Sequence, residues 1–168
     1  MVELEYYDSK KLILMKKSRF ILFAIVISVV AVFTTSCKKK GCTDPDAINY
    51  SREAEKDDGS CSFEGAMVFY YIEATAAKLV SDGAITMTYY VDGRTIGSSD
   101  ANIYWTGPPY CGDSGTIGVT KSWANNRTRE YYYSVRDQTG WEFWGGPITF
   151  YGNTCVSTEL SAFKKKKK

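Results

Sequence analysis

Five cysteines and no histidine limit the chemistry that this chain of 168 residues can perform. Cys37 and Cys42 lie five positions apart, with three lysines directly after the first of them. Two thiols at such a spacing can form a metal site or a redox pair. The absence of His removes the commonest general base and the commonest zinc ligand, and it excludes Ser–His–Asp, Cys–His and His-Glu-x-x-His arrangements. The residues that flank each thiol must therefore decide its role.

Residues 15–36 have the organisation of an export signal. A basic segment precedes an apolar run of 14 residues, positions 20–33. A membrane-spanning helix needs about 20 apolar residues, whereas the apolar region of a signal peptide has about 7–15. We therefore expect residues 15–36 to be a cleaved signal peptide. Residues 1–14 are then an upstream extension, and Met15 is the expected start of the chain.

The residues directly before Cys37 resemble the lipobox of bacterial lipoproteins. Thr35 and Ser36 are small, as a lipobox requires, whereas Thr34 stands where the family usually has Leu or another aliphatic residue. In that family the cysteine is acylated and becomes the first residue of the mature chain, so the resemblance implies a lipid on Cys37. A plain secretory signal is the alternative. A lipid would bring the lysines at 38–40 to the bilayer, where each contributes about 1 kcal/mol near anionic headgroups.

A second resemblance begins at Cys42. The stretch GCTDPDAINYSREAEKDDGSC, residues 41–61, resembles C-T-D-P-x-A-x-N-Y-x-x-x-A-x-x-D-D-G-S-C, a short module of secreted proteins from Bacteroidetes and related bacteria. The resemblance implies a lineage and an exported location, but no activity. Together with the lipobox it implies an outer-membrane lipoprotein with a lipidated tether at 37–41. Surface-exposed lipoproteins of this group tend to carry acids after the acylated cysteine, so the lysines at 38–40 favour the periplasmic face.

Residues 42–61, called the acidic module below, are too few and too polar to bury a core. A Cys42–Cys61 bridge would stabilise them by about 3 kcal/mol in the chain-entropy model. Two interpretations of the acids remain open. One is a calcium site, since Ca²⁺ prefers carboxylate and carbonyl oxygens in turn-rich loops. Its candidate ligands are Asp44, Asp46, Asn49, Asp57 and Asp58. The other is a spacer with solvated acids, which we favour because the Gly and final Glu of an EF-hand are not at the required positions.

From residue 64 to 163 the pattern changes to short β-rich runs separated by turns. The clearest is a hairpin over 84–97, with a primed turn at Asp92-Gly93. The predicted strand segments are 67–74, 84–97, 102–107, 116–120, 128–137, 140–152 and 155–160. No helix of convincing length is expected. The pattern predicts an all-β domain, a small antiparallel β-sandwich of immunoglobulin-like or similar type. In the run at 140–152, alternation puts Trp144 on the face opposite Trp141 and Phe143.

The remaining cysteines are expected to form disulfides, because export leads to an oxidising compartment. With Cys37 acylated, four cysteines allow three pairings. We favour Cys42–Cys61 and Cys111–Cys155, since each bridge then stays within one structural unit. The β-domain also resembles that of uncharacterised Bacteroidetes lipoproteins, through residues 90–93 (YVDG), 109–112 (PYCG), 144–146 (WGG) and the late Cys155. This resemblance implies a fold and a compartment only.

The charge distribution bears on the partners of the chain. Residues 41–163 hold eight Lys and Arg against sixteen Asp and Glu, a net charge of −8, and the positive charge lies near the ends, including the basic tail at 164–168. An acidic body argues against nucleic-acid binding. The expected partners are the membrane, through the lipid, and a polysaccharide or another envelope protein.

We therefore expect a non-catalytic envelope lipoprotein with a binding or structural role and no required cofactor. One alternative is a carbohydrate-binding module that stacks tryptophans on sugar rings, with acids such as Asp100 or Asp113 accepting hydroxyl groups. Its candidate residues are Trp105, Trp123, Trp141 and Trp144. The competing interpretation of these rings is ordinary core and rim packing. A second alternative is a calcium-binding spacer that supports adhesion.

Overall fold

The computed structural model describes residues 38–161. All the elements below belong to one compact unit, which begins at Lys39. The signal peptide, the upstream extension, the lipidation of Cys37 and the basic tail lie outside the described residues and stay predictions. Between residues 38 and 161, no helix is long and apolar enough to cross a membrane.

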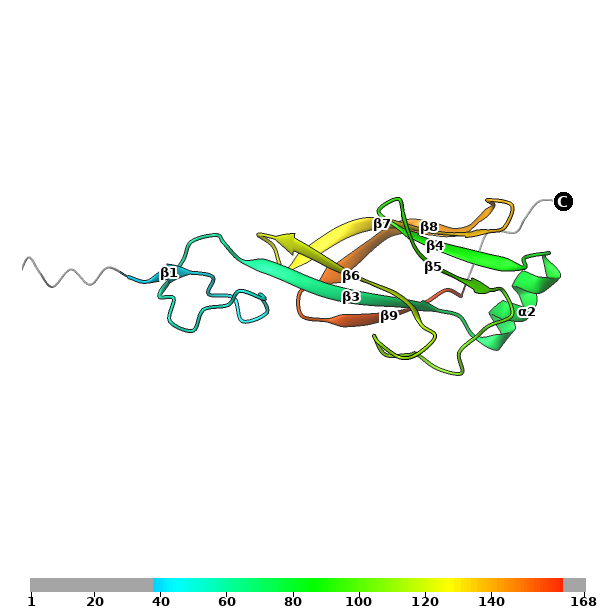
Figure 1. The fold of residues 1–168 in the computed structure, drawn as a ribbon, viewed down its shortest axis with the longest axis horizontal. Helices are drawn as coiled ribbons and strands as arrows, with labels where there is room; N and C mark the ends of the chain where they lie inside the picture. The colour runs from blue at the N-terminus through cyan, green and yellow to red at the C-terminus, as the bar shows by residue number, and fades with distance from the viewer. Residues whose placement is uncertain (1–37, 162–168) are drawn as a thin grey trace, which may run out of the picture. The chain divides into compact units, whose positions relative to one another are not determined.

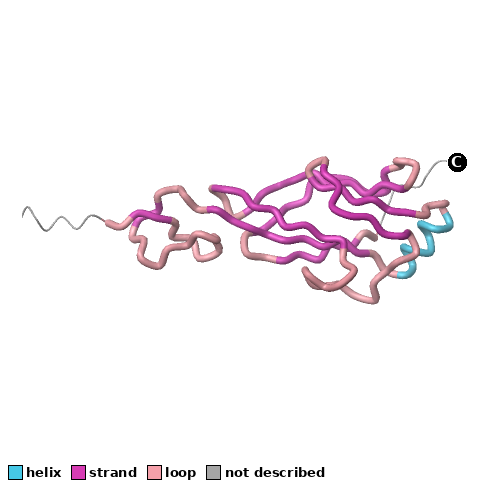
Figure 2. The backbone as a smooth tube through the Cα atoms, in the orientation of Figure 1, coloured by secondary structure: helices cyan, strands magenta, loops and turns pink. Residues whose placement is uncertain are grey.

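The described chain is mostly β, with one short helix and two disulfides, which confirms the predicted class in its coarse form (Figures 1 and 2). The strands are β1 (Lys40–Gly41), β2 (Lys56–Asp57), β3 (Ser62–Tyr70), β4 (Thr86–Val91), β5 (Arg94–Asp100), β6 (Ile117–Ala124), β7 (Thr128–Asp137), β8 (Glu142–Tyr151) and β9 (Cys155–Glu159). They form a four-stranded sheet, β5-β4-β7-β8, a three-stranded sheet, β6-β3-β9, and the small pair β1-β2, in which the residues just before the acidic module pair with a strand of the module.

The hydrophobic core takes side chains from both larger sheets. Alternate residues of β3, namely Phe63, Met67 and Phe69, belong to it, and β4 contributes Tyr89 and Val91. Aromatic rings join the sheets, since the ring centroid of Phe69 on β3 lies 5.4 Å from that of Tyr133 on β7. The period of two along each strand therefore produces the core, as expected for sheets with one solvated face.

The hairpin of β4 and β5 is as predicted. Asp92 and Gly93 both have positive φ, 56° and 71°, which a type I′ turn requires. Strand β7 also has the predicted bounds, Thr128–Asp137. These elements were predictable because their signals are local.

The helix α2 (Glu73–Ser81) was not predicted, and its first two residues were assigned to a strand that ends at Tyr70. Its sequence, EATAAKLVS, is rich in helix-forming Ala, Leu, Lys and Glu. Glu73 in the first turn and Lys78 in the last complement the helix dipole. Ala76 and Leu79 are buried three positions apart. A stripe this narrow over nine residues is too short to produce a clear helical period.

Two further expectations about strands are wrong. Residues 102–107 form no strand, and the whole stretch 101–116 between β5 and β6 is irregular. Strand β9 pairs with β3 in parallel, so the sheets are not purely antiparallel. The chain leaves the four-stranded sheet at the end of β8 and enters the other sheet as β9. The direction of β9 is set by this passage from one sheet to the other, and no local pattern in the sequence indicates it.

A β-bulge explains where Trp144 lies. Arg136 on β7 pairs with Glu142, and the preceding residue, Val135, pairs with Trp144, so Phe143 is an extra residue on β8. Such a bulge breaks the alternation of faces. Phe143 and Trp144 are consequently both in the core, 1% and 6% exposed. The prediction that they occupy opposite faces is wrong for this reason.

Candidate functional site

The acidic module is closed by the predicted Cys42–Cys61 disulfide. The two cysteines are 1% and 4% exposed, which makes them part of the buried residues of this region. The acids near Cys61 cap a tight turn. Asp57 Oδ1 accepts a hydrogen bond from Gly59 N at 3.0 Å, and Asp58 Oδ1 accepts one from Ser60 N at 3.0 Å. Hydrogen bonds from Ser60 lower the pKa of the Asp58 carboxyl below its ordinary value.

The acids near Cys42 face the β-domain instead. Arg127, between β6 and β7, donates from Nε to Asp44 Oδ2 at 2.6 Å, and its Nη1 lies 3.1 Å from Asp46 Oδ2. The hydrogen bond from Arg127 is the main reason why the pKa of Asp44 lies below its ordinary value. We call this arrangement of Arg127, Asp44 and Asp46 the Arg127 junction.

Backbone and amide contacts reinforce the Arg127 junction. Ile48 N donates to Ser62 O at 2.9 Å, and Asn125 N donates to Cys61 O at 2.9 Å. Asn49 uses both ends of its amide, since Nδ2 donates to Ser60 O at 2.6 Å and Oδ1 accepts from Ser62 N at 2.9 Å. The acidic module is therefore joined to the start of β3 and to the β6–β7 turn.

These contacts bear directly on the predicted calcium site. Among residues 38–161, no group of three or more His, Cys, Asp or Glu side chains is placed so that it could hold a metal ion. Two of the five predicted ligands bind Arg127, two cap their own turn, and Asn49 bonds the backbone around Cys61. The arrangement favours the spacer interpretation of the acidic module.

The four tryptophans do not form one platform. Trp123 and Trp144 lie in the core, where their ring centroids are 6.4 Å from Phe63 and 6.1 Å from Tyr71. Neither offers an open ring face to a sugar. Trp105 and Trp141 are half-buried, on two different loops. A sugar site that uses all four rings is therefore incompatible with the fold, and only Trp105 and Trp141 remain as predicted ligand contacts.

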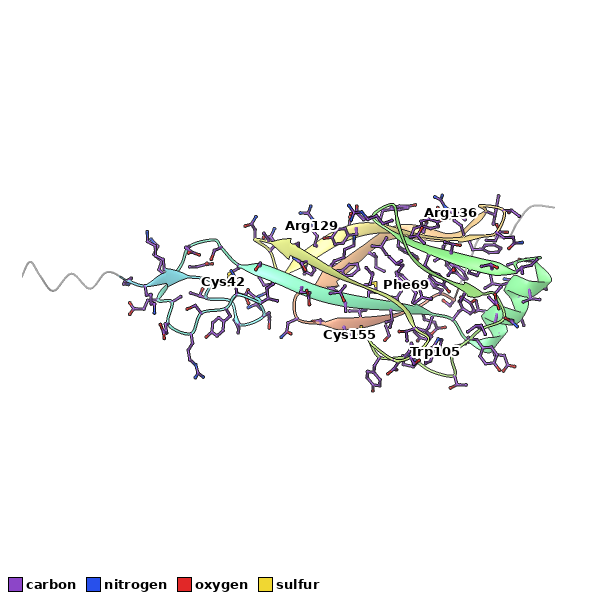
Figure 3. All side chains as sticks on the ribbon, in the orientation of Figure 1. Cys42, Phe69, Trp105, Arg129, Arg136 and Cys155 are labelled. Carbon is purple, nitrogen blue, oxygen red and sulfur yellow. A yellow bond between two sulfur atoms is a disulfide. The ribbon has the colours of Figure 1, made fainter. Side chains whose placement is uncertain are left out.

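The structure places the most exposed aromatic residue of the described chain on the irregular stretch 101–116, which we call the connection loop. Tyr110 on this loop is 78% exposed, and Tyr104 is also exposed. Figure 3 labels Trp105 on the same loop. Ordered loops longer than about 12–15 residues are uncommon and usually functional, and aromatic residues are enriched at binding surfaces. The connection loop is therefore the best candidate for a ligand-contacting element.

Several contacts hold the connection loop in place. At its start, Tyr71 Oη donates to Ala101 O at 3.3 Å, and burial raises the pKa of this tyrosine, so its hydroxyl stays a donor. Trp105 N donates to Tyr71 O at 3.0 Å. Further along, Ser157 Oγ donates to Pro109 O. The loop is thus bonded to the end of β3 and to β9.

The second disulfide fastens the middle of the loop. Cys111 is bonded to Cys155, the first residue of β9, as predicted; Figure 3 labels Cys155. Cys111 N also donates to Cys155 Sγ at 3.1 Å. Asp113, one of the predicted hydroxyl acceptors, is used within the loop, because its Oδ2 accepts from Tyr110 N at 2.8 Å. The other, Asp100, lines a hollow beside Val80 and Ile85 near α2.

The connection loop covers part of the outer face of the three-stranded sheet. Val68 and Tyr70 alternate with the core residues of β3, yet they are buried. Val68 lines a hollow together with Cys111 and Gly112 of the loop. Opposite Val68 on β6 stands Gly118, where a Cβ atom would lie only 2.8 Å from Val68 Cγ1. A glycine is required there because the side chain of Val68 occupies the space.

The sequence contains a signal for this loop that strand patterning missed. Between residues 101 and 116 it has two consecutive prolines, a cysteine and three aromatic residues. Proline lacks the N–H that a sheet ladder needs, which argues against a strand.

The disulfides indicate an oxidising compartment outside the cytoplasm. No protein-family model, curated protein or solved structure matches the chain.

Proposed function

We propose that this chain is an exported, non-catalytic binding protein, anchored to the outer membrane by a lipid on Cys37 and facing the periplasm. Its ligand-contacting element is the connection loop. The observation that carries this proposal is that a long loop with exposed aromatic rings is fastened by a disulfide to a sheet with its own core. A loop held in one conformation loses little entropy when it binds.

The start of the folded chain supports a short anchor. Lys39 O accepts hydrogen bonds from Glu55 N at 2.8 Å and from Lys56 N at 3.3 Å, and β1 begins at Lys40. Residues 39–41, most of the tether expected at 37–41, are therefore bonded to the acidic module. A lipid on Cys37 would hold this module directly at the membrane surface.

The path of β3 separates the anchor from the loop. β3 starts directly after Cys61 and runs for nine residues, about 30 Å at 3.3 Å per residue. Beyond its far end, Tyr71 O accepts from Trp105 N in the connection loop. In the proposed orientation, the acidic module is next to the lipid, the Trp105 end of the loop lies at the far end of β3, and Cys111 lies beside the middle of this strand.

Two features support a role without catalysis. The chain has no histidine, and Cys42, Cys61, Cys111 and Cys155 are committed to disulfides. The two larger sheets resemble a β-sandwich of immunoglobulin-like or similar type, apart from the parallel strand β9. Such domains commonly carry binding sites on the loops of a rigid scaffold.

The anchor can be tested by mass spectrometry and membrane fractionation of the chain produced in a Gram-negative host. We expect the mature protein to begin at an acylated Cys37 and to contain two disulfides. Cys37→Ser should move the protein from the membrane fraction to the soluble periplasmic fraction, while Lys38→Ser, as the matched control, should not. A mature chain that keeps residues 15–36, or an unmodified Cys37, would contradict the proposal.

The binding role can be tested on the loop itself. Tyr110→Ala removes an exposed ring without removing a core contact, so the melting temperature should change little. Photo-crosslinking from position 110 should capture the same ligand reproducibly, and crosslinking from Ser98, exposed on β5, should not. Equal capture from both positions would argue against the connection loop as the site.

A further inference from the structure

A groove crosses the outer face of the three-stranded sheet beside the connection loop. It consists of two hollows of about 260 Å³ each, which share Ala66 and Thr120 in their linings. One hollow extends to Thr116 and Gly112 of the loop, and the other extends to Asn153 at the β8–β9 turn. Because they share lining residues, the two hollows lie next to each other on the same face of the sheet. We call them together the loop-walled groove.

The floor of the loop-walled groove consists of small residues. On β3, Ala66 pairs with Thr120 of β6 on one side and with Cys155 of β9 on the other. One step further along, Val68 pairs with Gly118. Short side chains in adjacent strands leave a shallow channel in which a flat ligand can approach the backbone. The Cys111–Cys155 disulfide forms the wall toward the loop.

The charge of the groove restricts the ligand. Within the linings of the two hollows, the sole charged side chain is Glu64, and no Lys or Arg is present. Residues 41–163 carry a net charge of −8. An anionic ligand would therefore be repelled, with no cation to pair with it.

The polar groups of the groove suit a ligand with many hydroxyl groups. Thr116 Oγ1 donates to Asp113 O at 2.8 Å, and Thr154 Oγ1 donates to Gly152 O at 3.0 Å, so each hydroxyl uses its proton within the protein and keeps its lone pairs for accepting hydrogen bonds. Glu64 Oε2 accepts from Ser122 Oγ at 3.2 Å and retains acceptor capacity. Asn153 adds an amide that both donates and accepts.

We propose that the loop-walled groove binds a neutral polysaccharide chain, with Tyr110 available to stack on a sugar ring at the rim. This inference rests on the proposed binding function and names its ligand class. A peptide fits less well, because the groove lies on the face of the sheet, whereas the unpaired edges of β6 and β9 offer their main-chain groups sideways, in the plane of the sheet. Its small, polar floor also lacks the deep apolar pocket that an anchoring side chain needs.

The test compares two arginine substitutions on exposed hydroxyl residues. Thr120→Arg places a long side chain in both hollows, while Ser98→Arg, on the edge strand β5, is the matched control. The full chain in mild detergent, with both disulfides intact, is run through gels that contain xylan, mannan or β-1,3-glucan, and it is pulled down with cellulose and chitin. Polygalacturonate serves as the anionic probe.

We expect wild type to be retained by at least one neutral polymer and not by polygalacturonate. Thr120→Arg should weaken the retention about tenfold or more, and Ser98→Arg less than about twofold. Equal melting temperatures of the two variants would show that both are folded. Retention that survives Thr120→Arg, or that is stronger on polygalacturonate, would overturn the inference.

Other outcomes separate this inference from the proposed function. Retention that is lost in Tyr110→Ala but kept in Thr120→Arg would overturn the groove and leave the connection loop as a binding site. If no polymer is retained, but the crosslinker at position 110 still captures one reproducible ligand, the polysaccharide assignment fails and the binding function stands. If neither assay detects a ligand, both fail.

Discussion

The two disulfides hold two regions, the acidic module and the connection loop, whose other stabilising contacts differ. In the acidic module, Cys42 and Cys61 are themselves buried, and the other contacts include turns, the pairing of β2 with β1 and the Arg127 junction. At the connection loop, Cys155 is exposed, and the bond attaches an irregular segment to a sheet that has its own core. The same kind of bond thus extends the core into the acidic module in one region and positions a surface in the other.

The largest expected effect comes from removing the loop disulfide. Cys111→Ser together with Cys155→Ser removes the bond that closes a loop with a sequence separation of 44 residues. The chain-entropy model then predicts that the free energy of unfolding falls by about 4 kcal/mol. Urea unfolding followed by tryptophan fluorescence measures it. A fall below about 1 kcal/mol would mean that the loop is held by its hydrogen bonds, and the contrast between the two regions would disappear.

Removing the module disulfide should have a smaller and local effect. Cys42→Ser with Cys61→Ser removes the bond that closes a loop with a sequence separation of 19 residues. The chain-entropy model gives this bond a stabilisation of about 3 kcal/mol. Because the β-domain keeps its core, we expect the loss within the acidic module. Trypsin should then cleave after Arg52 and Lys56, while the fragment that contains β3 to β9 stays intact. Cleavage spread over the β-domain would show that the two regions unfold together.

A substitution on β6, beneath the connection loop, tests how closely Val68 packs against this strand. Gly118→Ala puts a Cβ atom 2.8 Å from Val68 Cγ1 and 2.9 Å from Met67 O. Crowding of this kind costs about 1–3 kcal/mol. Gly107→Ala, in the connection loop itself and with open space around its Cβ position, is the control. Equal melting temperatures for the two variants would contradict a close fit between Val68 and β6.

The smallest effect is expected at the Arg127 junction, whose groups are exposed to solvent. The pKa of Asp44 is lowered in the folded chain from its ordinary value of 3.8. Its contribution to stability is therefore present above pH 3.8 and is lost as the pH falls below that value. The melting temperature of wild type minus that of Arg127→Gln should be constant from pH 5 to 7, and it should shrink toward zero below about pH 3.8.

The control for this prediction keeps the positive charge. Arg127→Lys should retain part of the difference, although it cannot contact both carboxylates as a planar guanidinium does. A difference that is independent of pH would mean that Arg127 stabilises the turn between β6 and β7 through packing instead.

Local signals in the sequence were sufficient for some of these features. The Asp92-Gly93 turn and strand β7 follow from residue types within a few positions, and the disulfide pairing follows from keeping each bridge within one unit. The helix α2 was missed because nine residues hold too little periodicity. The bulge at Phe143 was missed because alternation cannot show an inserted residue.

The functional regions were harder to predict, since they depend on contacts between distant residues. Asp44 and Arg127 are 83 positions apart, and no spacing rule joins them. Tryptophans were selected as ligand contacts by residue type, but the fold buries Trp123 and Trp144 and leaves Tyr110 exposed. Burial of an aromatic ring is decided by the packing of the two sheets, which residue type does not encode.

The parallel pairing of β3 and β9 has a mechanical consequence. These are the first and last strands of the β-domain, and five register pairs, from Ala66–Cys155 to Tyr70–Glu159, join them side by side. Tension between the start of β3 and the end of β9 pulls the two strands along their length in opposite directions. Their hydrogen bonds are then loaded in shear, all at once, and do not open one after another. The domain is built to resist being pulled from its two ends.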